Sequence, residues 1–441
     1  MRLPTDLPRD VVAMSGVAFC VALGFGVVAP AIPLFATQFG VDAAAAGAVV
    51  SVFALMRLLS GLLAGRVVDA LGERTSLMIG VAVVGLSSLL AGLSENYPQL
   101  LALRGVGGVG SAVFGVAAMS LVLRVASQRM RGRAVSVYRG GFLVGGIAGP
   151  AVGGAVLGIS LRAPFFLYAG TLALAGVVAM VFVSRPQPAT ARAGIDQATD
   201  LPLEPDPGSG RDPAVESPPV HDGEQPDERV PVASSDPSAG RDRAADEDHP
   251  PEATLRDLLG TREYQAALVT NLAVGLAVLG LRSTVVPLLF VHHLQVDVGW
   301  VGAAFVSSAL VQTALMFPAG RFTDTIGRRA AIVLGSTVAA VGMLMLAVAS
   351  SLVIALIAMG VFGAGSAFLG TAPAALVGDV AGKRSGQTIA VFNMASDFGA
   401  VTGPVLAGWL VDQGSYAAAF GMGAGVLLVA GALGLRLPSS R

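Results

Sequence analysis

The stretch Gly65-Arg66-Val67-Val68-Asp69-Ala70-Leu71-Gly72-Glu73-Arg74 decides the fold, because the chain repeats its pattern about 255 residues later. The second copy reads Gly320-Arg321-Phe322-Thr323-Asp324-Thr325-Ile326-Gly327-Arg328-Arg329. Each copy joins two long apolar stretches. A charged turn with glycines, repeated between hydrophobic blocks in both halves, indicates a duplicated membrane protein, and transporters are commonly built by such duplication.

The composition supports a membrane protein. Of the 441 residues, 54% are hydrophobic and only 13% are charged, whereas soluble domains carry about 25% charged residues. The apolar residues form continuous blocks of about 18 or more, long enough to cross a hydrocarbon layer as helices. Barrel strands would alternate instead. We therefore predict an all-α membrane protein with twelve transmembrane helices, at about 11–36, 43–63, 75–93, 100–122, 134–158, 163–183, 266–291, 298–318, 330–349, 352–377, 387–411 and 416–435.

The twelve spans divide into two pseudo-symmetric six-helix halves, 1–184 and 253–441. A second phrase repeats at the same offset, as Gly145 to Gly154 in span five and Gly399 to Gly408 in span eleven. Between the halves, residues 185–252 hold 13 of the 25 prolines, 16 acidic residues and 6 arginines. Such a segment has too little apolar surface to fold alone. We predict a disordered, acidic, Pro-rich cytoplasmic linker.

Arginine sets the expected orientation. The loops that follow spans two, four, eight and ten hold eleven basic residues, and Arg162 is the only clear basic residue in the loops on the other side. Cytoplasmic loops carry such an excess. We expect a multi-pass protein of the cell (inner) membrane with both termini in the cytoplasm.

These residues resemble the major facilitator superfamily. The loop phrase is similar to its G-x-x-x-D-x-x-G-x-R/K signature, and Arg104 with Gly108 resembles its R-x-x-x-G element. The span-five phrase resembles the antiporter motif of the twelve-span drug:proton antiporter branch. That motif is matched by Gly145, Gly149, Pro150, Gly153 and Gly154. Many antiporters of this branch carry an acid in span one or span four, and this chain has none there.

The repeated phrases have two readings each. The first is that the loop residues form a cytoplasmic latch that holds the halves together in one state, with Asp69 near a helix N-terminus and Arg74 paired to Asp69 or to the other half. The alternative is a solvated turn. The span-five glycines either seal the surface between the halves or only pack helices closely. The predicted latch comprises Gly65, Asp69, Gly72, Arg74, Gly320, Asp324, Gly327 and Arg329.

Charged residues inside a membrane are costly and usually functional. Asp397 is the one acid deep within a predicted span, and we expect it to be the proton-coupling acid. The alternative is a structural ion pair with an intramembrane arginine. By resemblance, Arg104 would tune proton affinity. The remaining candidates, for substrate binding or as counter-ions, are Arg57, Arg139, Arg282, Asn393, Phe25 and Gln312.

We predict a secondary active transporter, with proton-coupled efflux of small amphipathic organic compounds by alternating access. The alternatives are a metabolite uptake symporter or facilitator of the same fold, and a transporter-like sensor that signals through the linker. We expect a monomer whose partners are a small-molecule substrate, protons and the lipid bilayer. No phosphate-binding loop, nucleophile motif or metal-ligand spacing is present in the sequence, so we expect no enzyme, cofactor or metal site. The acidic linker gives no basis for nucleic-acid binding.

Overall fold

The computed structural model describes residues 8–126, 130–183, 255–381 and 385–438. The predicted linker therefore lies outside the described residues. Within these ranges the chain forms helices only, and twelve of the resulting spans are long and apolar enough to cross a membrane. This confirms the predicted fold class and the number of spans.

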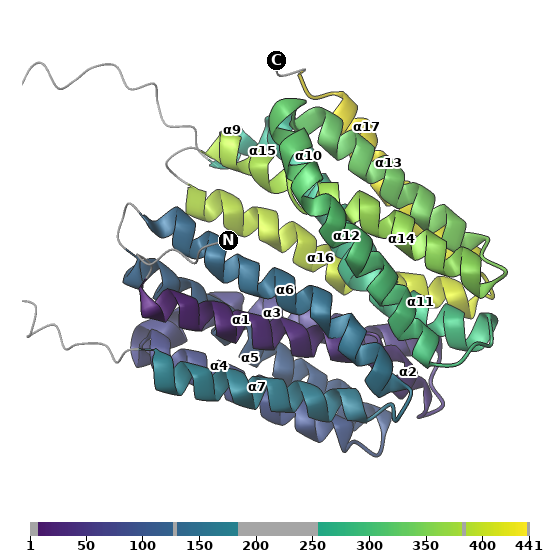
Figure 1. Ribbon diagram of the computed structural model, residues 1–441, viewed down its shortest axis with the longest axis horizontal. Coiled ribbons are helices and arrows are strands. Elements are labelled where there is room, and N and C mark those ends of the chain that lie inside the picture. The colour runs from purple at the N-terminus through teal and green to yellow at the C-terminus, as the bar shows by residue number, and fades with distance from the viewer. Residues whose placement is uncertain (1–7, 127–129, 184–254, 382–384, 439–441) are drawn as a thin grey trace, which may run out of the picture. The chain divides into compact units, whose positions relative to one another are not determined.

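In the described residues the first half consists of six spans built from seven helices, and Figure 1 shows their arrangement. Helix α1 packs against α6 and α7, and α5 packs against α3 and α4. Their buried side chains form one continuous apolar cluster that includes Leu77, Leu121 and Phe165. The helices are α1 (Arg9–Val28), α2 (Ala31–Thr37), α3 (Ala43–Leu71), α4 (Glu73–Gly92), α5 (Tyr97–Val125), α6 (Arg131–Leu157) and α7 (Ala163–Phe182).

The second half repeats this plan. Helix α13 packs against α14 and α17, and α16 packs against the helical segments of span seven. A short helix, α9 (Leu255–Leu259), precedes span seven. The other elements are α10 (Arg262–Val274), η2 (Gly275–Leu281), α11 (Arg282–Leu288), η3 (Leu289–His293), α12 (Gly299–Thr325), α13 (Arg328–Ala347), α14 (Leu352–Leu369), α15 (Ala372–Ala381), α16 (Ser385–Asp412) and α17 (Tyr416–Leu435).

Three spans are interrupted where the sequence predicts continuous helices. Span one breaks at Ala29 and Pro30, and Pro30 has no backbone N–H to continue the ladder. Span ten breaks at Gly370 and Thr371. Span seven alternates between α-helix and the wider π-helix, in η2 and η3.

The loop phrases are mostly helical, which corrects the prediction of a turn. Helix α3 continues through Asp69 to Leu71, and α12 continues through Asp324 to Thr325. Only the second glycine of each phrase turns the chain, with φ of 78° at Gly72 and 114° at Gly327. Glycine is favoured at such angles because it has no Cβ.

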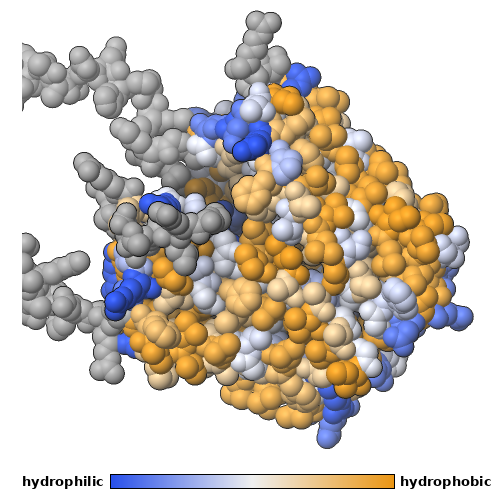
Figure 2. Space-filling model, in the orientation of Figure 1, coloured by the Kyte–Doolittle hydropathy of each residue, from blue (hydrophilic) through white to orange (hydrophobic). Residues whose placement is uncertain are grey.

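The exposed surface of the spans is apolar. Large side chains such as Leu59, Phe317 and Val353 are 60%, 75% and 64% exposed. Figure 2 shows hydrophobic residues over the middle of one face and hydrophilic residues gathered toward two opposite ends. Exposure of this apolar surface to water would be unfavourable, whereas in a bilayer the same surface faces lipid. We call the end with Gly72 and Gly327 the motif end, and the end with Asp42 and Asp412 the opposite end.

Candidate functional site

A cavity of about 650 Å³ lies between the two halves. Its walls carry five phenylalanine rings, from Phe25, Phe53, Phe114 and Phe142 in the first half and Phe305 in the second. The cavity is therefore mostly apolar, with a small number of polar groups, as is usual for sites that bind organic molecules. Its polar and charged lining residues include Arg57, Ser111, Tyr168, Arg282, Ser283, Asn393 and Asp397.

One ion pair crosses from half to half in the cavity wall. The Arg57 guanidinium on α3 donates a hydrogen bond to the Asp397 carboxylate on α16. The two side chains are 36% and 21% exposed, so both remain in contact with the cavity. The sequence left open whether an arginine would neutralise Asp397 and which arginine it would be. The structure brings Arg57 to this position.

The seam between α3 and α16 runs from this pair to the opposite end. The two helices are antiparallel: Gly47 lies against the backbone of Pro404, and Gly408 lies against Ala43. At the end of the seam the Asp412 carboxylate accepts hydrogen bonds from the backbone N–H groups of Ala43 and Ala44, both at 2.8 Å. These N–H groups begin helix α3 and have no partner within it.

Toward the motif end the same two helices separate. Gly61 on α3 and Asn393 on α16, each about one turn beyond the ion pair, line the cavity. No atom lies within 4 Å of where a side chain at Gly61 would begin. The halves are thus joined along this seam at the opposite end and apart at the motif end.

Asp412 gives a prediction about this seam. In Asp412→Ala, two backbone donors of α3 lose their acceptor, a change that costs about 1 kcal/mol for a helix cap. We expect the equilibrium to move about fivefold toward a state that is open at the opposite end. Spin labels at Ile159→Cys and Gln413→Cys, in a Cys20→Ala background, would show this as a larger fraction of long distances.

The control for this change is Asp297→Ala. The Asp297 carboxylate also accepts from a helix N-terminus, at Gly299 (2.8 Å), but within a single half. It should leave the distance distribution unchanged. An equal shift in both variants would contradict a special role for Asp412.

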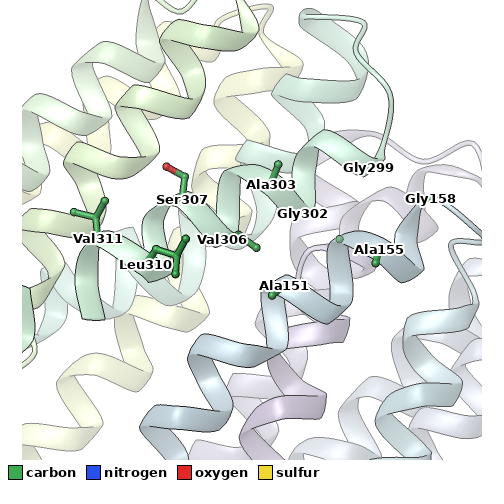
Figure 3. A pocket seen from close by; sticks show the side chains of 11 residues that line it. Ala151, Ala155, Gly158, Gly299, Gly302, Ala303, Val306, Ser307, Leu310 and Val311 are labelled. Carbon is green, nitrogen blue, oxygen red and sulfur yellow. The ribbon is translucent and has the colours of Figure 1, made fainter. Parts of the chain in front are cut away.

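A second seam joins the halves where α6 meets α12. Gly154 and Gly302 meet backbone to backbone, and a side chain added at either position would collide with the other glycine. Figure 3 shows the shallow groove that the two helices form beside this contact, lined by Ala151, Ala155, Ala303 and Val306 among others. Small residues allow such close approach of helices in membranes.

The span-five motif divides between two tasks. Gly145, Gly149 and Gly153 contact the backbone of α1, at Phe19, Leu23, Gly26 and Val27, so they pack one half internally. Gly154 alone of the motif glycines contacts the other half in this structure. Gly154 thus lies between the two halves, whereas Gly145, Gly149 and Gly153 pack within one half. That the motif seals the halves stays a prediction. Pro150 lines the cavity.

The loop phrases make their recorded polar contacts within their own halves. Arg74 donates to the carbonyl of Met180 at 2.7 Å, and it is not recorded in an ion pair in the described part of the chain. The Nε atom of Arg328 lies 2.9 Å from Oδ2 of Asp379, and its Nη1 atom lies 3.9 Å from Oδ1 of Asp324. The predicted latch is thus not engaged in this state, in agreement with the separation of the halves at the motif end.

Two further arginines lie beside the cavity without an acidic partner. Arg104 is 3% exposed, stacks over Phe53 at 4.5 Å from the ring centroid, and lines a recess that adjoins the cavity. Arg282 lines the cavity itself. In the described ranges, all recorded ion pairs involve other arginines.

Some predicted site residues lie elsewhere. Arg139 is exposed, and neither it nor Gln312 is among the residues that line the cavity. Of the predicted set, Arg57, Arg282, Asn393 and Phe25 do line it. Sequence reasoning missed Phe53, Tyr168, Ser283 and Phe305, which carry no motif, and Asp412. The last could have been suspected as an acid at the end of an apolar run. Among the described residues, no cluster of three histidine, cysteine, aspartate or glutamate side chains could hold a metal ion.

Comparison with known proteins defines the class. The family pattern of the Major Facilitator Superfamily matches residues 14–259 and 267–440. The chain belongs to the Major Facilitator Superfamily. This family and the fold point to a transporter rather than to an enzyme.

The chain is also similar to individual members. It is 30% identical over 165 residues to multidrug resistance protein 2 of Bacillus subtilis, covering 37% of this chain and 41% of that protein. It is 26% identical over 173 residues to the quinolone resistance protein NorA of Staphylococcus aureus, covering 39% and 44%. These matches span less than half the length of either relative. A bacterial homologue of the human lysosomal transporter Spinster has the same fold, with a TM-score of 0.65, 15% identity and coverage of 98% and 96%.

Proposed function

We propose that the protein is a secondary active transporter that exports small amphipathic organic compounds in exchange for protons. The observation that carries this proposal is the cavity between the halves. Two helix seams close the cavity at the opposite end, and the helices that line it are separated at the motif end. Transport by alternating access requires a central site of this kind and two seams that can exchange roles.

The orientation follows from charge. Arginine is concentrated in the loops at the motif end, and cytoplasmic loops carry this excess. We infer that the motif end faces the cytoplasm in the cell membrane, together with both termini. The described state then receives substrate from the cytoplasm.

Asp397 is the residue that we assign to proton coupling. Its carboxylate contacts the cavity and holds Arg57 across the seam between α3 and α16. For the opposite end to open, these helices must part and this pair must break. A proton on Asp397 removes the negative charge that holds the pair, so protonation and conformational change are linked at one residue.

The direction of transport rests on the sequence relatives and on the antiporter-like motif in span five. Both curated relatives are drug-resistance proteins by name. Uptake of a metabolite by the same fold is the alternative. The Gly149-Pro150 phrase argues against uptake, whereas the missing acids in spans one and four weaken the argument for proton exchange. A sensor that signals through 185–252 is a third possibility, which concerns residues outside the described ranges.

Vesicles that contain the purified full chain and the pH dye pyranine test the proposal. A panel of aromatic probes with one naphthalene ring and an anionic, neutral or cationic group is added outside, without an imposed gradient. We expect at least one probe to drive proton movement opposite to its own, several-fold faster than in protein-free vesicles. Proton movement in the same direction as the probe would establish symport instead, and no movement with any probe would contradict proton coupling.

A further inference from the structure

The charges around the cavity do not balance. Arg57 and Arg282 line it, and Arg104 lines the adjoining recess, which shares Phe25, Phe53 and Arg57 with the cavity. Asp397 is the one acid among the lining residues, and it is paired with Arg57. Two guanidinium groups are therefore left without a counter-charge in the described structure. Uncompensated charge in a region of low dielectric is unfavourable unless a bound ligand or ion of opposite charge neutralises it.

Arg104 is compensated in part by its surroundings. It is almost fully buried and lies over the Phe53 ring, and the negative face of an aromatic ring attracts a cation. Arg104 thus adds positive potential to the site, while its exposure is too small for direct contact with a large ligand.

Arg282 has unused hydrogen-bonding capacity. A guanidinium group carries five N–H donors. The one recorded hydrogen bond goes from Nη1 to the Ser308 hydroxyl at 3.5 Å, the long limit of such a contact. The buried Nε has no partner. The rings of Phe305 and Phe362 lie 5.3 and 5.9 Å from the guanidinium carbon.

The backbone around Arg282 is unusual as well. The residue stands at the junction of the π-helical segment η2 and helix α11. π-Helical turns are rare and often occur at functional sites. Here the wide segment η2 packs on α16, where Gly280 contacts Gly403 and Pro404. The position of the arginine is therefore fixed by contact with the helix that also carries Asp397.

We propose that the cavity selects organic anions: the acidic group of the substrate binds Arg282, and its apolar body lies against the phenylalanine rings of the cavity. A carboxylate, sulfonate or phosphate group could accept two parallel hydrogen bonds from the guanidinium. The proposal rests on the proposed transport function but not on its direction. A cationic compound of the same shape would meet the positive potential of two arginines that have no acidic partner, and its binding is disfavoured.

Binding of three matched probes to the detergent-solubilised full chain tests this, by titration calorimetry without any flux. The probes are 2-naphthoate, 2-naphthalenemethanol and 2-naphthylmethylammonium, which share one apolar body. We expect 2-naphthoate to bind at least tenfold more tightly than the other two. Arg282→Gln should remove this preference, with little change for the neutral alcohol, and Arg282→Lys should keep part of it.

The matched control is Arg139→Gln, which removes an exposed arginine from a span and does not touch the cavity lining. It should bind 2-naphthoate as the wild type does. If Arg282→Gln fails to fold, as judged by gel filtration, the relative affinities of the wild-type protein for the three probes still test the proposal. Equal or tighter binding of the cation, or no binding of 2-naphthoate, would overturn the proposal. Because no transport is measured, this result is separate from the pyranine experiment.

Discussion

Replacement of Asp397 by asparagine is expected to abolish uphill transport while downhill equilibration continues. The amide cannot release a proton, so it resembles the protonated acid and uncouples the cycle from the pH gradient. With one proton exchanged per substrate, a gradient of one pH unit supports about tenfold accumulation. In Asp397→Asn we expect this ratio to fall to about one, measured as probe accumulation in vesicles with an imposed gradient.

Two controls separate coupling from a purely structural ion pair. Glu95→Gln neutralises an exposed acid near the start of α5 and should retain accumulation. The double variant Arg57→Gln with Asp397→Asn removes both charges, so neither is left unpaired in the wall. We expect it to recover the thermal stability lost in the single variant but not the accumulation. Accumulation by either Asp397 variant would show that another group carries the proton.

Gly302→Leu is expected to block the state described here. A side chain at this position collides with the backbone of Gly154 across the seam between α6 and α12, and backbone cannot move aside as a flexible side chain can. Overpacking of this kind costs about 1–3 kcal/mol, which corresponds to about five- to 150-fold in the population of the joined state. Transport should fall by a similar factor, because the cycle has to pass through that state.

The reference for this variant is Gly425→Leu. Gly425 lies on the exposed side of α17, with no atom within 4 Å of an added side chain. The Gly425→Leu variant carries the same substitution in another membrane-spanning helix, and we expect it to transport at the wild-type rate. The spin-label pair at positions 159 and 413 should report longer distances in Gly302→Leu only. Normal transport by Gly302→Leu would mean that this contact is not part of the cycle.

The fold was predictable because the bilayer restricts the solutions. Long apolar blocks must become helices, and the repeated phrases and arginines fix their number and division into halves. Helix ends were less predictable: charged residues such as Asp69 can continue a helix into the interface, so the loop phrase looked like a turn. The π-helical segment of span seven has no sequence pattern that distinguishes it from ordinary helix.

The site was predictable only where a residue type is rare in a membrane. Asp397, Arg57 and Arg282 stood out because charge in hydrocarbon is costly. The pairing of these residues was not predictable. Arg57 and Asp397 are 340 residues apart, and their contact depends on which sides of α3 and α16 are turned toward each other. Arg139 has the same residue type but an exposed position, and Phe53 has a central position but an unremarkable residue type.

The interruptions of spans one, seven and ten have a consequence for how the protein changes state. Spans one and seven line the cavity, and at Pro30, at Gly370 and along η2 the regular α-helical ladder is replaced or absent. These points resist bending less than an unbroken helix does. Closure over a bound molecule can thus begin with local flexing of half-spans at these three points, ahead of any wholesale rotation of one bundle against its twin.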